Sequence, residues 1–149
     1  MKQPKDIRIL LVEDNPDDVE LTLKVFRKYN IVNQILVARD GEEALKILFN
    51  FKKGVQREKR PDLILLDLKL PKVDGLEVLH QIKSHPRTQP IPVVILTSSR
   101  EEDDLIKSYQ LGVNSYIRKP VNFDNFIEVV RQLGLYWLIL NEPLPKEKE

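Results

Sequence analysis

Short apolar runs alternate with amphipathic stretches along most of the chain. The clearest runs are residues 7–12, 63–66 and 92–96, with weaker ones at 34–37 and 115–117. Runs of this length, rich in Ile, Leu and Val and bounded by Pro or Asp, are typical of strands buried on both faces. The pattern therefore predicts five strands.

The stretches between these runs carry apolar residues at helical spacing. The expected apolar stripes are Val19, Leu23 and Phe26; Ala44, Leu45, Leu48 and Phe49; Leu76, Leu79 and Ile82; Leu105, Tyr109 and Leu111; and Phe123, Phe126, Ile127, Val130 and Leu133. Strands that alternate with helices form βαβ units with right-handed crossovers. The predicted class is α/β, a doubly wound parallel sheet with helices on both faces.

Composition restricts the function further. The chain has 149 residues, of which 42% are hydrophobic and 32% are charged, with no cysteine and a net charge of +1. The absence of cysteine excludes disulfides, a thiolate nucleophile and cysteine-ligated metals. No apolar run approaches the ~20 residues of a membrane span, and the N-terminus does not resemble a signal peptide. We therefore expect one cytoplasmic domain that does not contact membranes and does not bind polyanions through its net charge.

Chemically distinctive residues follow the predicted strands. Glu13 and Asp14 come after the first strand, Asp67 after the third, Thr97 at the end of the fourth and Lys119 after the fifth. Each has an ordinary explanation as a helix cap, a turn residue or a solvated charge. Ligands of doubly wound sheets bind at the carboxyl ends of the strands, and capping does not explain why all five residues gather there.

The set is suited to phosphoryl transfer. Mg²⁺ is held by one or two carboxylates together with water and phosphate oxygens, which fits Glu13, Asp14 and Asp67. An aspartate such as Asp67 can act as a nucleophile toward phosphorus. A lysine and a hydroxyl, here Lys119 and Thr97, can then contact the oxygens of the transferred group.

Four segments carry a resemblance to a known family. They are LLVEDNPDD at 10–18, DLILLDLKLPKVDGLEVL at 62–79, PVVILTSS at 92–99 and LGVNSYIRKPVNFDNF at 111–126. In this order they resemble the response-regulator receiver domain of two-component signalling. The resemblance implies a flavodoxin-like five-stranded sheet of order 2-1-3-4-5 with five helices. It also implies a protein that is not an enzyme beyond its own phosphorylation and dephosphorylation, and that accepts a phosphoryl group on Asp67 from a sensor histidine kinase.

The resemblance assigns further roles residue by residue. It implies that Glu13, Asp14, Asp67 and the backbone carbonyl of Lys69 bind Mg²⁺, that Thr97 and Tyr116 are the switch residues, that Lys119 contacts the phosphoryl group, and that the bond before Pro120 is cis. This chain has Glu-Asp in place of the commoner Asp-Asp pair. Lys69 and Ser99 occupy positions that influence dephosphorylation in the family, so the lifetime of the phosphorylated state is left open.

The C-terminal residues indicate how the domain would pass on its signal. We expect a receiver domain over 1–140 with an extended last helix and a short tail over 141–149, leaving no length for an effector domain. The end of the last helix is apolar almost all round. We expect a homodimer surface there, made of Tyr109, Tyr136, Trp137, Leu138 and Leu140. The alternative is that the apolar segment folds back onto its own domain.

A basic connection over 51–61 precedes the third strand. It lacks interleaved aromatics and a recognition-helix pattern, so a solvated loop is favoured over direct DNA binding. This connection and the tail are similar to those of stand-alone receivers paired with phytochrome-type sensor kinases.

Two other functions remain open at this stage. A phosphorylation-independent interaction domain would keep the fold without using the acidic residues. A Mg²⁺-dependent phosphatase would use Asp67 as a transient nucleophile, but Lys69 stands where such an enzyme needs its second acid.

Overall fold

The protein is built on one parallel sheet, seen in a computed structural model that describes residues 8–28, 34–49, 60–98, 101–119, 124 and 128. Its strands are β1 (Arg8–Val12), β2 (Gln34–Ala38), β3 (Leu63–Leu66), β4 (Val93–Thr97) and β5 (Ser115–Arg118). They lie in the order β2-β1-β3-β4-β5, and every neighbouring pair is parallel. The predicted fold class and strand order are confirmed.

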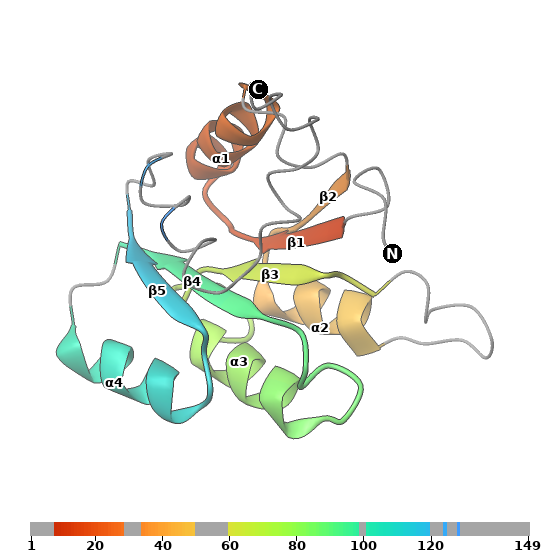
Figure 1. Ribbon diagram of the computed structural model, residues 1–149, viewed down its shortest axis with the longest axis vertical. Coiled ribbons are helices and arrows are strands. Elements are labelled where there is room, and N and C mark those ends of the chain that lie inside the picture. The colour runs from red at the N-terminus through yellow and green to blue at the C-terminus, as the bar shows by residue number, and fades with distance from the viewer. Residues whose placement is uncertain are drawn as a thin grey trace, which may run out of the picture.

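Within the described residues, four helices connect these strands. They are α1 (Pro16–Lys28), α2 (Gly41–Phe49), α3 (Gly75–Ser84) and α4 (Glu102–Gln110). Figure 1 shows α1 on one face of the sheet and the other three on the opposite face. The predicted fifth helix falls outside the described residues except for Asp124 and Glu128, which are both helical. None of the helices within the described residues has the length and apolarity needed to cross a membrane.

The middle of the sheet forms the core. Every residue of β3 and β4 is buried, as is β1 after its first residue, whereas β2 at the edge alternates between exposed and half-buried positions before its buried last residue, Ala38. Strands covered on both faces are expected to be continuously apolar, which is why these runs stand out in the sequence. The carboxyl ends of β1, β3 and β4 are therefore held rigidly by the core.

The predicted apolar stripe of α4 is wrong at Tyr109, whereas Leu105 and Leu111 are half-buried and Leu111 packs against the core. Tyr109 is 50% exposed, and the buried positions of this helix are Asp104 and Ser108. Both polar side chains have partners, because the Ser108 hydroxyl donates to the Asp104 carbonyl over 2.8 Å and Asp104 pairs with Lys69. The helix thus buries satisfied polar groups, which a count of apolar residues does not reveal.

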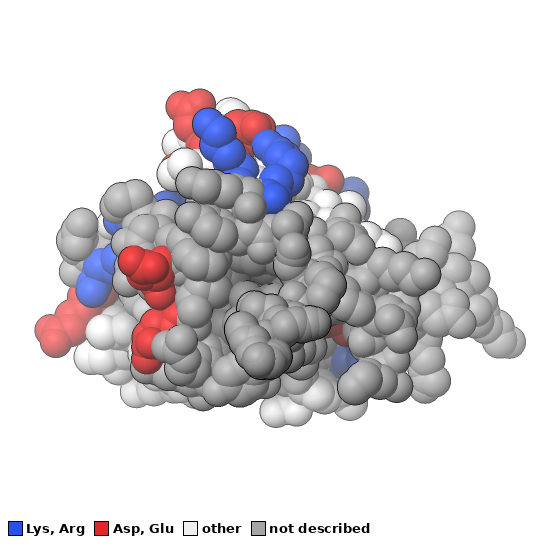
Figure 2. Space-filling model, turned by 45° about the horizontal axis from the view of Figure 1, so that its top comes forward, with Lys and Arg blue, Asp and Glu red and all other residues white. Residues whose placement is uncertain are grey.

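The start of α1 is fixed by its cap. The side-chain oxygen of Asn15 accepts hydrogen bonds from the backbone N–H groups of Asp17 and Asp18, over 2.8 and 3.1 Å. An Asn in this position satisfies donors that the helix itself leaves open. Further along α1, the Arg27 guanidinium lies 3.2 Å from the Glu20 carboxylate. Figure 2 shows acidic and basic side chains beside each other at the top of the molecule, where α1 lies (Figure 1).

Candidate functional site

The acidic residues that follow β1 and β3 lie side by side. The Glu13 N–H donates to the Ala38 carbonyl over 2.9 Å, and the Asp67 N–H donates to the Val12 carbonyl over 3.0 Å. Sheet pairing therefore continues past the strand ends and places both carboxylates at one edge. One oxygen each of Glu13, Asp14 and Asp67 lie within 4.8 Å of one another, with Asp14 exposed and the other two buried.

Lys119 lies among carboxylates from three elements. Its ammonium Nζ is 2.6 Å from Glu13 Oε1, 2.9 Å from Asp18 Oδ2 and 3.1 Å from Asp67 Oδ2. The lysine follows β5, and its N–H donates to the Thr97 carbonyl over 2.8 Å, so pairing with β4 directs it to the same edge. The structure thus brings the predicted lysine to the predicted phosphoacceptor.

The electrostatics of this group follow from burial and from the partners. Burial, helped by the negative charge of Asp67, raises the pKa of Glu13 to about 7. The hydrogen bond from Lys119 acts in the opposite direction and lowers this pKa. Burial on its own would lower the pKa of Lys119, but its hydrogen bonds to Glu13 and Asp18 and the charge of Asp67 raise that pKa above its usual range. The lysine is therefore a fixed positive charge, whereas Glu13 changes its protonation state near neutral pH.

The two predicted switch residues lie on the neighbouring strands. Thr97 is the last residue of β4 and is fully buried. Tyr116 is half-buried on β5 beside Ile95 of β4, and the Arg118 guanidinium carbon lies 5.7 Å from the centre of its ring. Of the other predicted positions, Pro120, Tyr136, Trp137, Leu138 and Leu140 lie outside the described residues.

The loop after β3 joins the site to two helices. The Lys69 N–H donates to Asp67 Oδ1 over 3.3 Å, and the Lys69 ammonium lies 3.4 Å from Asp104 of α4. The negative charges of Asp104, Glu101 and Asp74 raise the pKa of Lys69, although its small burial opposes this. At the end of the loop the Gly75 N–H donates to the Leu68 carbonyl over 3.0 Å, so the loop closes tightly against the start of α3.

Sequence reasoning missed two members of this arrangement. Asp18 contacts Lys119, and Asp104 contacts Lys69. Asp18 lies four residues after Asp14, and this one-turn spacing at a helix start was a usable indication that it points back toward the strand ends. No comparable feature marks Asp104, because its burial depends on how α4 packs.

The donor set fits a divalent cation such as Mg²⁺ or Mn²⁺. Three carboxylates provide oxygen ligands only, as hard cations prefer, and one of them is exposed, so that water can complete the coordination. No histidine belongs to the cluster found among the described residues. The role of the Lys69 carbonyl as a further ligand stays a prediction.

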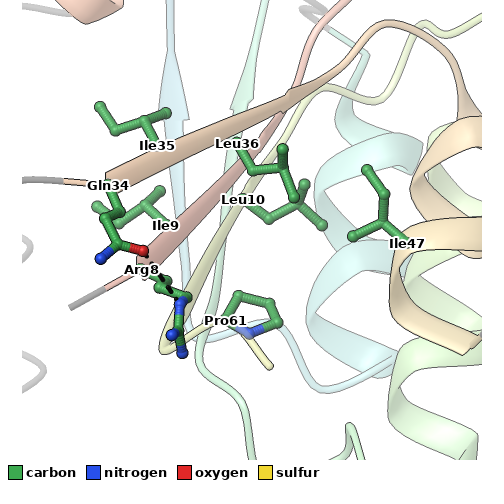
Figure 3. A pocket seen from close by; sticks show the side chains of 8 residues that line it. All are labelled: Arg8, Ile9, Leu10, Gln34, Ile35, Leu36, Ile47 and Pro61. Carbon is green, nitrogen blue, oxygen red and sulfur yellow. Dashed lines mark hydrogen bonds between the residues drawn. The ribbon is translucent and has the colours of Figure 1, made fainter. Parts of the chain in front are cut away.

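A separate hollow lies at the opposite ends of the strands. Its volume is about 480 Å³, and it is lined by Arg8, Ile9, Leu10, Gln34, Ile35, Leu36, Ile47 and Pro61 (Figure 3). Its lining is mainly aliphatic, and the Arg8 side chain donates to the Gln34 side-chain oxygen over 3.1 Å. Most of these residues come from the starts of β1 and β2, with Ile47 from α2 and Pro61 from the segment before β3, so the hollow is not part of the carboxylate site.

Comparison with known proteins agrees with the architecture of this site. Residues 9–131 match the model of the response regulator receiver domain. The chain belongs to this family. Receiver domains are the phosphorylatable modules of two-component signalling, and the predicted family is therefore confirmed.

Several receiver proteins are close in sequence and structure. The response regulator Rcp1 of Synechocystis sp. is 43% identical over 130 residues, which is 87% of this chain and 88% of Rcp1. The solved bacteriophytochrome response regulator AtBRR is 52% identical, with a TM-score of 0.77 over 91% of this chain and 98% of that one. The Mn²⁺-bound form of Rcp1 gives 42% identity and a TM-score of 0.73 over 93% of this chain and 99% of that one.

Proposed function

We propose that this receiver domain is a signalling switch that accepts one phosphoryl group on Asp67. The observation that carries the proposal is the position of this carboxylate. It is buried at the end of β3, 3.1 Å from the Lys119 ammonium and in one cluster with Glu13 and Asp14. A nucleophile, a fixed cation and a set of oxygen ligands thus meet at one point.

Each residue has a separate part in the transfer. A carboxylate oxygen of Asp67 forms a bond to phosphorus while the bond from phosphorus to the donor nitrogen breaks, which yields an acyl phosphate and the free donor. Glu13, Asp14 and Asp67 would hold Mg²⁺, which supplies positive charge for the phosphoryl oxygens when bound. Lys119 supplies a second positive charge, and its raised pKa keeps that charge in place.

Phosphorylation changes the charge at a rigid point in the fold. Asp67 exchanges a charge of −1 for about −1.5 to −2 and gains further acceptor oxygens. We expect Thr97, whose buried hydroxyl lies at the end of the adjacent strand β4, to respond to this group. Tyr116 lies beside β4 on β5, so a shift of Thr97 alters the surface formed by α4 and β5.

The similar proteins indicate the setting of this switch. AtBRR is a bacteriophytochrome response regulator, and Rcp1 has been solved with Mn²⁺ bound. We take a sensor histidine kinase of the phytochrome type as the phosphodonor and Mg²⁺ as the cellular cation. The chain then acts as a cytoplasmic regulator without direct DNA binding, and not as an enzyme on other substrates.

The first test is chemical phosphorylation. With Mg²⁺ and phosphoramidate, the wild type is expected to gain the mass of one phosphoryl group, and Asp67→Asn is expected to gain none. Intact mass spectrometry measures the adduct. Asp103→Asn, which removes an exposed carboxylate of α4, is the matched control and is expected to react like the wild type.

Three outcomes would contradict the proposal. Continuous turnover of phosphate esters would favour the phosphatase, and the absence of an adduct with any small donor would favour an interaction domain that does not use phosphorylation. Incorporation into Asp67→Asn would place the acceptor elsewhere.

A homodimer is the proposed form of output. Two large apolar side chains of α4, Ile106 and Tyr109, are 48% and 50% exposed and lie one helical turn apart. We expect Ile106→Glu to reduce the sedimenting mass of the phosphorylated protein from dimer to monomer, because an ionised carboxylate is poorly tolerated in an apolar contact. Leu21→Glu places the same charge on an exposed position of α1 and should leave the dimer intact. A monomeric wild type, or loss of the dimer in both variants, would contradict this surface.

A further inference from the structure

The Lys119 ammonium is shared by more carboxylates than the cation site contains. Among the described residues its acid partners are Glu13, Asp18 and Asp67. An ammonium group has three N–H donors, so three carboxylates can use all of them. Glu13 and Asp67 also belong to the group that could hold a metal, whereas Asp18 does not.

Asp18 is fixed in its position by the start of α1. Its backbone N–H donates to the Asn15 side chain over 3.1 Å, within the cap that begins the helix. Its side chain is 35% exposed, compared with 3% for Glu13 and 7% for Asp67. Asp18 therefore holds Lys119 from the solvent side, and the other two carboxylates hold it from the interior.

A divalent cation and Lys119 compete for the same oxygens. Two positive charges cannot share Glu13 and Asp67 without repulsion, and in a partly buried site that repulsion is large. When the metal takes these carboxylates, Asp18 is the acid partner that remains to the lysine in the described part of the chain. The negative charge of Asp18 lets the lysine stay near the phosphoacceptor without displacing the metal.

We propose that Asp18 is a positioning residue that holds the Lys119 ammonium beside Asp67 while Glu13 and Asp67 bind the divalent cation. The inference rests on the proposed function, in which Asp67 is phosphorylated at a cation site. It predicts that removing the Asp18 charge leaves Lys119 with only the two carboxylates that the cation also needs. The lysine then opposes cation binding more strongly, and it loses its partner once the cation is bound.

The test compares neighbouring aspartates without using phosphorylation. Asp18→Asn is expected to weaken Mn²⁺ binding about fivefold, measured by electron paramagnetic resonance with Mg²⁺ competition, because a hydrogen bond between charged groups is lost. Asp17→Asn removes the same charge from the adjacent exposed residue and should change the affinity by less than about twofold, since that charge is screened by solvent. Asp18→Glu should restore most of the affinity.

A second measurement follows the lysine directly. The ¹⁵N–¹H signal of the Lys119 ammonium, assigned by its loss in Lys119→Arg, is expected to persist in the wild type when Mg²⁺ is added and to broaden through water exchange in Asp18→Asn. Equal affinities for Asp17→Asn and Asp18→Asn, or an unchanged lysine signal in Asp18→Asn, would overturn the proposal. Neither measurement uses a phosphodonor, so a failure of Asp67 to become phosphorylated would be recognised separately.

Discussion

Replacement of Gly75 by alanine will destabilise the fold by about 3 kcal/mol, the upper end of what overpacking a tight site causes. A Cβ at this position would lie 2.4 Å from the Asp67 carbonyl oxygen and 2.5 Å from Leu68 Cα. Both are backbone atoms, which cannot rotate away as a side chain does. The start of α3 or the loop that carries Asp67 must therefore shift.

The same change should impair the site even where the protein is still folded. Because the clash is with the carbonyl of Asp67 itself, relief moves the proposed phosphoacceptor relative to Lys119. Urea unfolding gives the loss of stability, and phosphorylation by phosphoramidate at low temperature gives the effect on the site. We expect both to fall together.

Gly112→Ala is the matched control for this prediction. A Cβ there would have ordinary contacts with the Lys83 side chain, at 3.7 and 3.8 Å, but the residue has a φ of +96°. The expected loss is about 1 kcal/mol, from backbone strain alone, with normal phosphorylation. If Gly75→Ala proves no more destabilising than Gly112→Ala, the close packing of the β3–α3 loop does not limit stability.

The fold was predictable because its central strands obey a simple rule. Buried parallel strands are continuous apolar runs, and the residues that follow them must meet at one edge. Glu13, Asp67 and Lys119 were found in this way, since their positions depend on strand ends alone. The relative positions of these three residues follow from the register of neighbouring strands.

The features that could not be predicted from the sequence depend on the partners of individual side chains. Asp104 is buried by the packing of α4, where Lys69 pairs with its carboxylate, and no apolar pattern marks this position. The contact of Asp18 with Lys119 joins residues 101 positions apart, so no local pattern reveals this partner. Glycine is required at position 75 because the backbone of Asp67 and Leu68 packs against it. Contacts of this kind require the tertiary structure.

Substitution of Lys119 by methionine will destabilise the metal-free protein by about 3 kcal/mol at pH 8, because removing one partner of a buried ion pair leaves charge without compensation. Glu13, Asp18 and Asp67 all lose their shared cation. Lys72→Met is the control, since Lys72 is exposed and its ammonium lies at the longer distances of 3.8 Å from Asp40 and 3.7 Å from Glu42. Its loss should cost less than about 1 kcal/mol of stability.

The loss caused by Lys119→Met should depend on pH in a defined direction. The pKa of Glu13 is about 7 in the folded protein and 4.5 ordinarily, so the folded state binds more protons between these values and this group's contribution to stability falls as pH rises through that window. Lys119 opposes the shift, and its removal moves the pKa of Glu13 higher still. At pH 5.5 Glu13 is largely protonated with or without the lysine, so the difference between wild type and Lys119→Met should be smaller than at pH 8.

Urea unfolding in chelator at both pH values measures this difference in stability, and added Mg²⁺ should stabilise Lys119→Met more than the wild type. An equal loss at both pH values, unaffected by Mg²⁺, would assign the effect to packing of the lysine stem and contradict the role of its charge.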